Sequence, residues 1–164
     1  MSQNNTIKVT TGKELYNYQK IAIEEIFQKF DSAVDDYHLL YQLPTGGGKT
    51  VIFSEIVRRY ISKFNKKVLV LTHRIELSKQ TSNMLNEFGV PNKVINSTAK
   101  LEDQDNYDCF VAMVETLKNR LNDDKLDISD IGLVIVDEAH YNSFTKIFKF
   151  FDDSFILGVT ATPL

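Results

Sequence analysis

The stretch LLYQLPTGGGKT, residues 39–50, decides how this chain folds. Residues 39–43 form a short apolar run, which predicts a β-strand, and Pro44 ends that run. Three glycines follow at 46–48, and glycine lets the backbone turn tightly around an anion because it has no Cβ. From Lys49 to Phe64, apolar residues recur at helical spacing. A strand therefore leads into a helix through a loop whose backbone N–H groups can bind phosphate.

The residues of this loop suit the chemistry of a nucleoside triphosphate. The Lys49 ammonium would reach the β- and γ-phosphates, and the Thr50 hydroxyl would hold Mg²⁺. The strict phosphate-loop pattern has a glycine six residues before the lysine, where this chain has Leu43. A glycine-rich surface turn is the alternative interpretation, but the strand and helix on either side favour a nucleotide site. The residues expected to contact the nucleotide here are Pro44, Thr45, Gly46, Gly47, Gly48, Lys49 and Thr50.

Apolar runs alternate with helical patterns along the rest of the chain. Strands are predicted at 67–72, 93–96, 108–114, 132–136 and 155–160. Helices are predicted at 11–30, 74–88, 115–121 and 143–151. This alternation predicts an α/β domain in three layers, with a mainly parallel central sheet flanked by helices. We expect one folded domain over residues 11–164, preceded by a polar tail over residues 1–10.

Two acidic residues follow the most apolar of these strands. The strand at 132–136 delivers Asp137 and Glu138 to the carboxyl edge of the predicted sheet, where a phosphate-loop protein places its second magnesium ligand. Asp137 would hold Mg²⁺ through water, and Glu138 would orient and deprotonate the attacking water. An acid-rich helix N-terminus is the alternative interpretation of the pair. A nucleotide kinase is a further alternative, although a kinase needs no such neighbouring glutamate.

Taken together, these motifs resemble those of the superfamily-two helicases and translocases of the DEAH type. PTGGGKT at 44–50 is similar to the family's phosphate loop, DEAH at 137–140 to its acidic motif, and GVTATP at 158–163 to its third motif. LTHRIEL at 71–77, with Gln80, resembles motif Ia, and residues 111–117 resemble motif Ib more loosely. Residues 15–19 resemble the glutamine motif. Within the family, the chain resembles restriction-enzyme motor subunits and bacterial repair helicases.

The resemblance implies a RecA-like domain that binds ATP and Mg²⁺. Gln19 would then bind the adenine edge, and Tyr18 would hold Gln19 or the base in place. His140 would join Lys49, Asp137 and Glu138 among the catalytic residues. It would also couple the nucleotide site to Thr160 and Thr162.

The resemblance also implies that the domain acts on DNA or RNA. The residues that would face the phosphate backbone of a single strand are Thr72, His73, Arg74 and Thr116. The chain departs from the family pattern at two positions. Tyr16 stands two residues before the Tyr-Gln pair, where related proteins often have arginine, and Met113 stands where motif Ib usually has threonine.

Composition restricts the class of protein less than the motifs do. The chain has 164 residues, of which 43% are hydrophobic and 25% charged, and no apolar run long enough to cross a bilayer. Its single cysteine, Cys109, excludes an intramolecular disulfide and a cysteine-based zinc cluster, and we expect a cytoplasmic protein without a membrane partner. Residues 1–100 carry 14 Lys and Arg against 9 Asp and Glu, whereas residues 101–164 carry 5 against 13. This asymmetry points weakly to an anionic ligand, and solvated surface charge is the simpler interpretation.

Two functions from different classes remain open. The first is the ATP-binding motor domain of an ATP-dependent DNA or RNA helicase or translocase, which hydrolyses ATP with Mg²⁺ when a second domain completes it. The second is an isolated nucleotide- and nucleic-acid-binding module with negligible turnover. The resemblance implies an arginine finger on a second RecA-like domain of the same full-length protein. We expect that domain to be a partner that lies outside residues 1–164.

Overall fold

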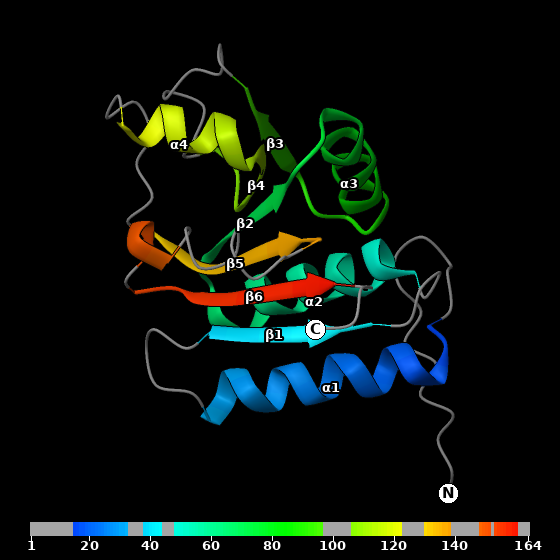
Figure 1. The fold of residues 1–164 in the computed structure, drawn as a ribbon. Helices are drawn as coiled ribbons and strands as arrows, with labels where there is room; N and C mark the ends of the chain where they lie inside the picture. Colours follow the sequence, from blue (N-terminus) through cyan, green and yellow to red (C-terminus); the bar gives the residue numbers. More distant parts are fainter. Residues whose placement is uncertain are drawn as a thin grey trace, which may run out of the picture.

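The computed structural model describes residues 15–32, 38–43, 48–96, 106–122, 130–138, 148–151 and 153–160. The strands are β1 (His38–Gln42), β2 (Lys67–Thr72), β3 (Asn92–Ile95), β4 (Cys109–Met113), β5 (Ile131–Asp137) and β6 (Phe155–Thr160). They form one sheet in the order β1-β6-β5-β2-β4-β3, and every pair of neighbours is parallel (Figure 1). The predicted α/β fold with a mainly parallel sheet is therefore confirmed.

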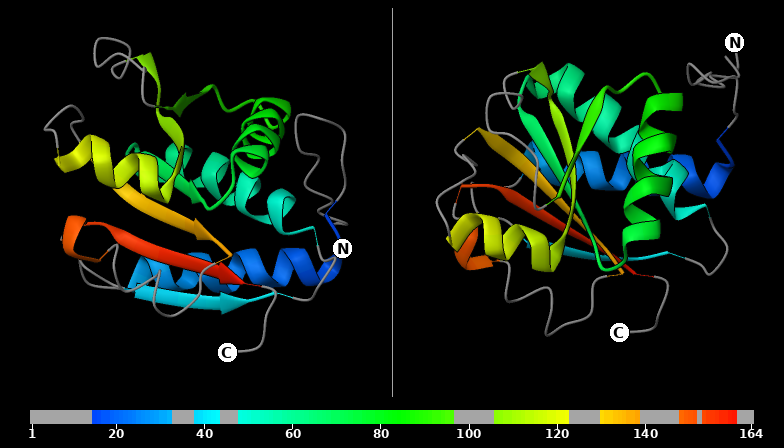
Figure 2. Two further views of the ribbon diagram at one scale, coloured as in Figure 1. Left: turned by 45° about the horizontal axis from the view of Figure 1, so that its top comes forward. Right: turned by 90° about the horizontal axis from the view of Figure 1, so that it is seen from above.

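Helices cover both faces of the sheet (Figure 2). One face carries α1 (Asn17–Ser32), α2 (Lys49–Phe64) and α3 (Ile75–Glu87), and the other carries α4 (Val114–Asn122) and the 3₁₀ helix η2 (Phe148–Phe150). Side chains of β2 alternate between the two cores, because Val68 and Val70 pack with α1–α3 whereas Leu69 and Leu71 pack with α4. Burial on both faces explains why the strand is apolar at consecutive positions. Among these described helices, none is long and apolar enough to cross a membrane.

The helix α2 has the bounds that the sequence predicts, 49–64. Gly48 precedes it with a φ of +68°, a left-handed conformation that glycine adopts without strain. Asn65 ends it with a φ of 52°, and the Asn65 N–H donates a hydrogen bond of 3.0 Å to the Ile61 carbonyl. The chain thus enters and leaves α2 through residues that tolerate left-handed backbone.

Two other predicted helices differ from the observed ones. The first begins at Asn17 instead of residue 11, since Leu15 and Tyr16 are not helical and residues 11–14 lie outside the described residues. The helix predicted at 143–151 overlaps the 3₁₀ helix η2, while residues 143–147 lie outside the described residues. The prediction is wrong at Phe151, which follows η2 and is buried in the core beneath α4.

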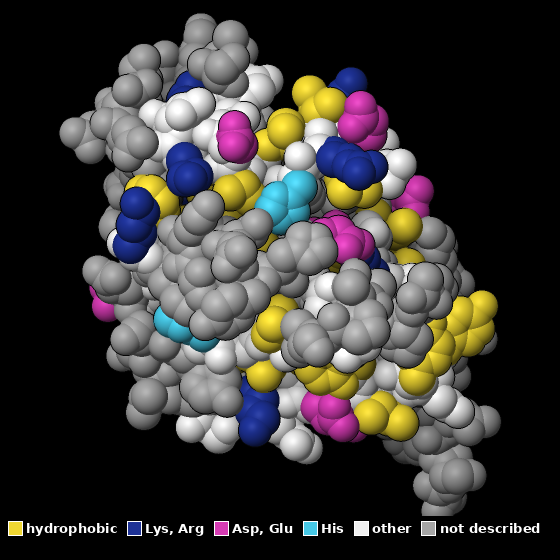
Figure 3. All heavy atoms as spheres, in the orientation of Figure 1, with side chains coloured by type: hydrophobic (Ala, Val, Ile, Leu, Met, Phe, Trp, Pro, Cys, Tyr) yellow, Lys and Arg dark blue, Asp and Glu magenta, His cyan; other side chains and the backbone are white. Residues whose placement is uncertain are grey.

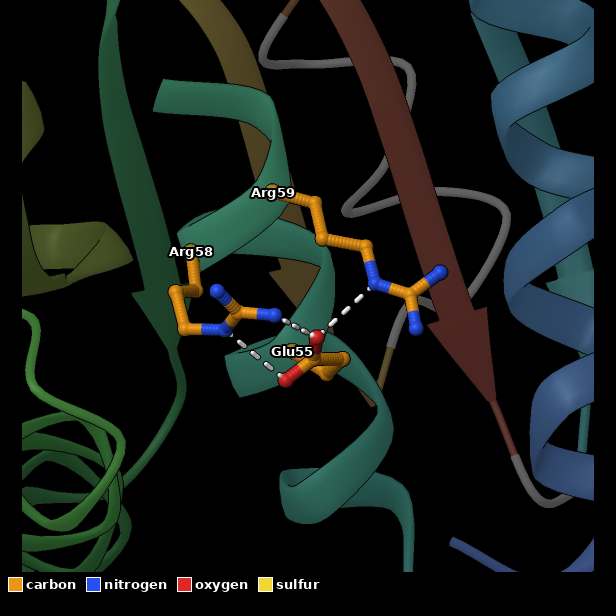
Figure 4. A network of polar contacts seen from close by, with 3 residues as sticks. All are labelled: Glu55, Arg58 and Arg59. Atoms are coloured by element: carbon orange, nitrogen blue, oxygen red, sulfur yellow. Dashed lines mark hydrogen bonds and ion pairs between the residues drawn. The ribbon is translucent and has the colours of Figure 1, made fainter. Parts of the chain in front are cut away.

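A buried carboxylate lies in the middle of α2. The Glu55 side chain is fully buried and accepts hydrogen bonds from Arg58 and Arg59 (Figure 4). The distance from Arg58 Nε to Glu55 Oε2 is 3.1 Å, and the distance from Arg59 Nε to Glu55 Oε1 is 2.8 Å. Figure 4 shows the two arginines reaching the carboxylate from different sides. The helix therefore supplies counter-charges for its own buried acid at i+3 and i+4.

The parallel arrangement brings all strand ends to one edge of the sheet. In Figure 1 the arrowheads of β1, β5 and β6 point the same way. The helix α1 returns to the start of β1, so α1 begins at the edge where the strands end. The described residues that the sequence predicts to bind nucleotide or nucleic acid all follow strand ends or helix starts at this edge.

Candidate nucleotide and nucleic-acid site

One lysine and two carboxylates meet at the carboxyl edge of the sheet. Lys49 is the first residue of α2, and Asp137 is the last residue of β5. The Lys49 Nζ lies 3.0 Å from Asp137 Oδ1 and also donates a hydrogen bond to Glu138 Oε1. Lys49 and Glu138 are 89 residues apart in the sequence. The sheet therefore brings together the two motifs that the sequence singles out for phosphate and magnesium.

The three groups differ in how far they are exposed. The Asp137 side chain is 4% exposed and the Glu138 side chain 37%. Burial alone lowers the pKa of Lys49, but the hydrogen bonds and charges of Glu138 and Asp137 raise it by more, so that its pKa lies above the ordinary 10.5. Lys49 is therefore positively charged throughout the physiological range, and the two carboxylates exceed its charge by one.

Glu138 reaches Lys49 from an unusual backbone conformation. Its φ is 55°, in the left-handed region that residues other than glycine seldom occupy. Such residues are concentrated at functional sites, where the surrounding structure holds them in place. The turn directs the Glu138 carboxylate back toward the start of α2, whereas a continued strand would carry it away.

The donor groups at this edge fit a magnesium ion. Mg²⁺ prefers oxygen ligands, and it is usually held by one or two carboxylates together with substrate phosphates. Asp137 Oδ1 is buried, and within the described residues it accepts no hydrogen bond of standard geometry, although the Lys49 ammonium is close. The Thr50 hydroxyl follows directly in the first turn of α2. Asp137 and Thr50 could therefore hold the ion, with Glu138 beside it.

Gln19 links the start of α1 to the end of the phosphate loop. Its Oε1 accepts a hydrogen bond of 2.9 Å from the backbone N–H of Tyr16. The φ of Gly48 favours glycine at this position, and a Cβ built there would lie only 2.7 Å from Gln19 Nε2, so a larger residue would also displace the Gln19 amide. Tyr18, which the sequence places beside Gln19, is partly exposed. The loop residues Pro44, Thr45, Gly46 and Gly47 lie outside the described residues.

The residues predicted to contact nucleic acid lie at neighbouring strand ends. Thr72 of β2 pairs with Met113 of β4, so the start of α3 lies next to the start of α4, where Thr116 is partly exposed. Arg74 is exposed at the start of α3, and His73 is half-buried. Thr72 itself is buried.

The Thr72 hydroxyl is used inside the protein. Its Oγ1 lies 2.6 Å from Ser78 Oγ and donates to the Arg74 carbonyl at 3.3 Å. These contacts hold the turn that exposes Arg74. Ser78 was not predicted from the sequence. It lies four residues after Arg74, one helical turn into α3, and this spacing could have indicated that the two residues are in contact.

Thr160, predicted to couple the nucleotide site to nucleic acid, ends the strand between β1 and β5. It is buried, and its carbonyl accepts a hydrogen bond of 2.8 Å from the Leu43 N–H at the start of the phosphate loop. Its neighbour Val159 is paired with Asp137. Thr160 thus lies between the two halves of the site. Its predicted partners His140 and Thr162 lie outside the described residues.

Comparison with known proteins finds relatives over most of the chain. Residues 12–164 match the family described as type III restriction enzyme, res subunit. The chain is 33% identical over 164 residues to IRC3 of Saccharomyces cerevisiae, a protein named as an ATP-dependent helicase, and the match covers 90% of this chain and 23% of IRC3. It is 30% identical over 144 residues to the ATP-dependent DNA helicase MPH1 of Scheffersomyces stipitis, covering 77% of this chain and 14% of MPH1.

A solved structure shows the same fold. The UvsW helicase from bacteriophage T4 superposes with a TM-score of 0.69 at 21% identity, covering 92% of this chain and 53% of that chain. The chain spans less than a quarter of the length of the two curated relatives. The chain therefore belongs to the family of the type III restriction enzyme res subunit, and it has the RecA-like fold of the N-terminal domain of superfamily-two helicases.

Proposed function

We propose that this chain is the ATP-binding motor domain of a DNA or RNA helicase or translocase and that it hydrolyses ATP with Mg²⁺ when a second RecA-like domain completes the site. The observation that carries the proposal is the meeting of Lys49 with Asp137 and Glu138 at the carboxyl edge of the sheet. Open parallel sheets bind their ligands at this edge. The family membership supports the same assignment.

Each of these side chains has a task in phosphoryl transfer to water. Lys49 would leave the two carboxylates and bind the β- and γ-phosphates, because it is already charged and stands at the end of the phosphate loop. Bound Mg²⁺ would neutralise phosphate charge, and Asp137 and Thr50 would hold it. Glu138, the most exposed of the three paired groups, would then be free to accept a proton from the attacking water.

The neighbouring strand ends would bind one strand of nucleic acid. Arg74 and Thr116 are accessible at the starts of α3 and α4, and helix N-termini bind phosphates through their free N–H groups. Thr72 would act by holding the turn that presents His73 and Arg74. Thr160, together with His140 and Thr162, would connect this surface to the nucleotide. The contacts expected are to phosphates, so they discriminate little among base sequences.

A second candidate function is a nucleotide- and nucleic-acid-binding module with negligible turnover. It is favoured by the ion pair between Glu138 and Lys49, which engages the proposed general base with the proposed phosphate-binding lysine. An arginine finger accelerates related reactions by about 10³–10⁵-fold. If another domain supplies it, the chain with that domain would be a motor and the chain without it a binding module.

Binding and turnover measured on the same chain test the proposal. Isothermal titration with ATP and Mg²⁺ is expected to show binding. Lys49→Ala should weaken the affinity by about 10- to 100-fold, which corresponds to the loss of a hydrogen bond to a charged group. Lys63→Ala is the matched control, because Lys63 lies on the same helix, α2, and pairs with Asp31 on the surface. Glu138→Gln should keep binding and abolish phosphate release.

Stimulation by single-stranded DNA or RNA separates the two candidate functions. Negligible phosphate release that nucleic acid does not stimulate supports the binding module for the isolated chain. Phosphate release that single strands stimulate, and that Glu138→Gln abolishes, supports a self-sufficient motor. ATP binding that is unchanged in Lys49→Ala would contradict both.

A further inference from the structure

His73 has a buried nitrogen that bonds to nothing in the described part of the chain. Its Nε2 is inaccessible to solvent and has no hydrogen-bond partner there, although the side chain as a whole is half-buried. Leaving a buried polar atom without a bond is unfavourable, so folded proteins keep few such atoms. An atom of this kind at the edge of a proposed reaction site is a candidate for a bond that forms only when the site is filled.

The strand pairing places His73 beside Glu138. β2 and β5 are parallel neighbours, and Leu71 of β2 lies opposite Val136 of β5. His73 and Glu138 each come two residues after their member of this pair, so both follow their strands at the same level of the carboxyl edge. In Figure 3, histidine and acidic side chains meet over the ends of β2 and β5. His73 is therefore a neighbour of the proposed general base.

Glu138 loses its present partner when a nucleotide binds as proposed. Its carboxylate now accepts a hydrogen bond from Lys49. Once Lys49 binds the β- and γ-phosphates, the carboxylate keeps its negative charge and needs another donor. The side chain is 37% exposed, so water alone would leave its direction poorly defined. A general base must instead be held within hydrogen-bond distance of the water that it deprotonates.

We propose that His73 is a positioning residue for Glu138, whose carboxylate accepts a hydrogen bond from His73 Nε2 after the nucleotide has drawn Lys49 away. The inference rests on the proposed function. A neutral imidazole protonated at Nε2 supplies the donor, and the second carboxylate oxygen stays available to the attacking water. Arg74, which we propose to contact nucleic acid, is the next residue in the chain. The turn after β2 therefore serves both ligands, through Arg74 for the strand and through His73 for the nucleotide site.

A double-mutant cycle on ATP affinity tests the inference without requiring turnover. The bond between His73 and Glu138 forms only in the nucleotide-bound chain, so its loss weakens binding. By titration calorimetry with ATP and Mg²⁺, His73→Ala is expected to weaken the affinity by about 5- to 50-fold, the loss of a hydrogen bond to a partly exposed charged group. In a Glu138→Ala background the same substitution should change the affinity by less than about twofold.

Conservative substitutions separate the donor from the space that the ring fills. His73→Gln places an amide N–H near the position of Nε2 and should keep most of the affinity. His73→Phe keeps a ring without a donor and should bind as weakly as His73→Ala. His38→Ala is the matched control, because His38 starts β1 at the opposite edge of the sheet. It should leave the affinity for ATP unchanged.

The imidazole itself reports the bond. The chain has three histidines, so the ¹⁵N signals of their rings can be assigned by substitution. Adding ATP and Mg²⁺ should shift the His73 Nε2 signal, and Glu138→Ala should remove most of that shift. Inorganic tripolyphosphate, which has no base or sugar, should produce the same shift because it also draws Lys49 away from Glu138. This measurement uses the unaltered chain, so it remains decisive if a His73 variant does not fold.

Three results would overturn the inference. ATP binding by His73→Ala equal to that of the unaltered chain would show that the bond does not form. A loss of affinity that persists in the Glu138→Ala background, or an Nε2 signal that ATP does not move, would show that His73 acts elsewhere. If ATP and tripolyphosphate still require Lys49, each of these results leaves the proposed nucleotide site standing. If neither ligand binds, the inference and the proposed function fall together.

Discussion

Replacing Glu55 by alanine is expected to destabilise the chain strongly. Its carboxylate is fully buried and accepts three hydrogen bonds from Arg58 and Arg59. The variant would leave two guanidinium groups, 34% and 23% exposed, without their counter-charge. Removing one partner of a buried ion pair costs about 3–5 kcal/mol, and partial access of both arginines to water lowers the expected loss to about 2–4 kcal/mol.

The Arg59 side chain makes this position sensitive. Its Nη2 is already buried without a hydrogen-bond partner within the described residues, so Arg59 depends on its bond to Glu55. The double variant Glu55→Ala with Arg59→Ala should therefore lose less stability than the sum of the single variants. For groups in direct contact this difference is about 0.5–3 kcal/mol.

Urea unfolding followed by circular dichroism measures the effect. A loss of about 2–4 kcal/mol corresponds to a fall in Tm of roughly 4–16 °C for a chain of this size. Glu24→Ala, an exposed acid on α1, is the matched control and should change the free energy of unfolding by less than about 0.5 kcal/mol. A Glu55→Ala variant as stable as Glu24→Ala would refute the reasoning.

Two further predictions concern the phosphate loop and the pH dependence of stability. Gly48→Ala should lower the free energy of unfolding by about 1–3 kcal/mol, because a φ of +68° strains alanine and its Cβ would meet Gln19; an unchanged urea midpoint would contradict this. Burial, then the hydrogen bond and charge of Glu25, raise the pKa of Tyr41 to about 12. Because folding raises the pKa of Tyr41 above its ordinary 10.0, the protonated hydroxyl stabilises the folded chain. This contribution to the free energy of unfolding is complete below pH 10 and is lost as the pH rises through about 12. Tyr41→Phe should flatten Tm against pH in that window, and an identical profile would count against the pair.

Strong local signals made parts of the fold predictable. The helix α2 was predicted at 49–64 and is observed there, with a glycine directly before it and an asparagine directly after it. The four consecutive apolar residues of β2 identified a strand buried on both faces at 67–72. The start of α1 was missed because its cap uses the side chain of Gln19, and the residue at the cap position, Tyr16, is not one of the usual capping types.

The candidate site was predictable as motifs but not as contacts. The sequence places Lys49, Asp137 and Glu138 at the ends of elements, and the parallel sheet brings them together. It does not reveal that the Thr72 hydroxyl faces inward, because that depends on Ser78 in the following helix. The turn at Glu138 was equally hidden, since left-handed backbone is rare for glutamate.

The position of β6 has a consequence for how the chain is made. This strand is the last of the six to be synthesised, yet it lies between β1, which carries the phosphate loop, and β5, which carries the acids. A nascent chain that ends just after Glu138 holds the phosphate loop and the acidic pair that we propose to bind nucleotide, but it lacks the strand that sets them side by side. The proposed nucleotide site can therefore assemble only after residues 155–160 have left the ribosome and inserted into the middle of the sheet.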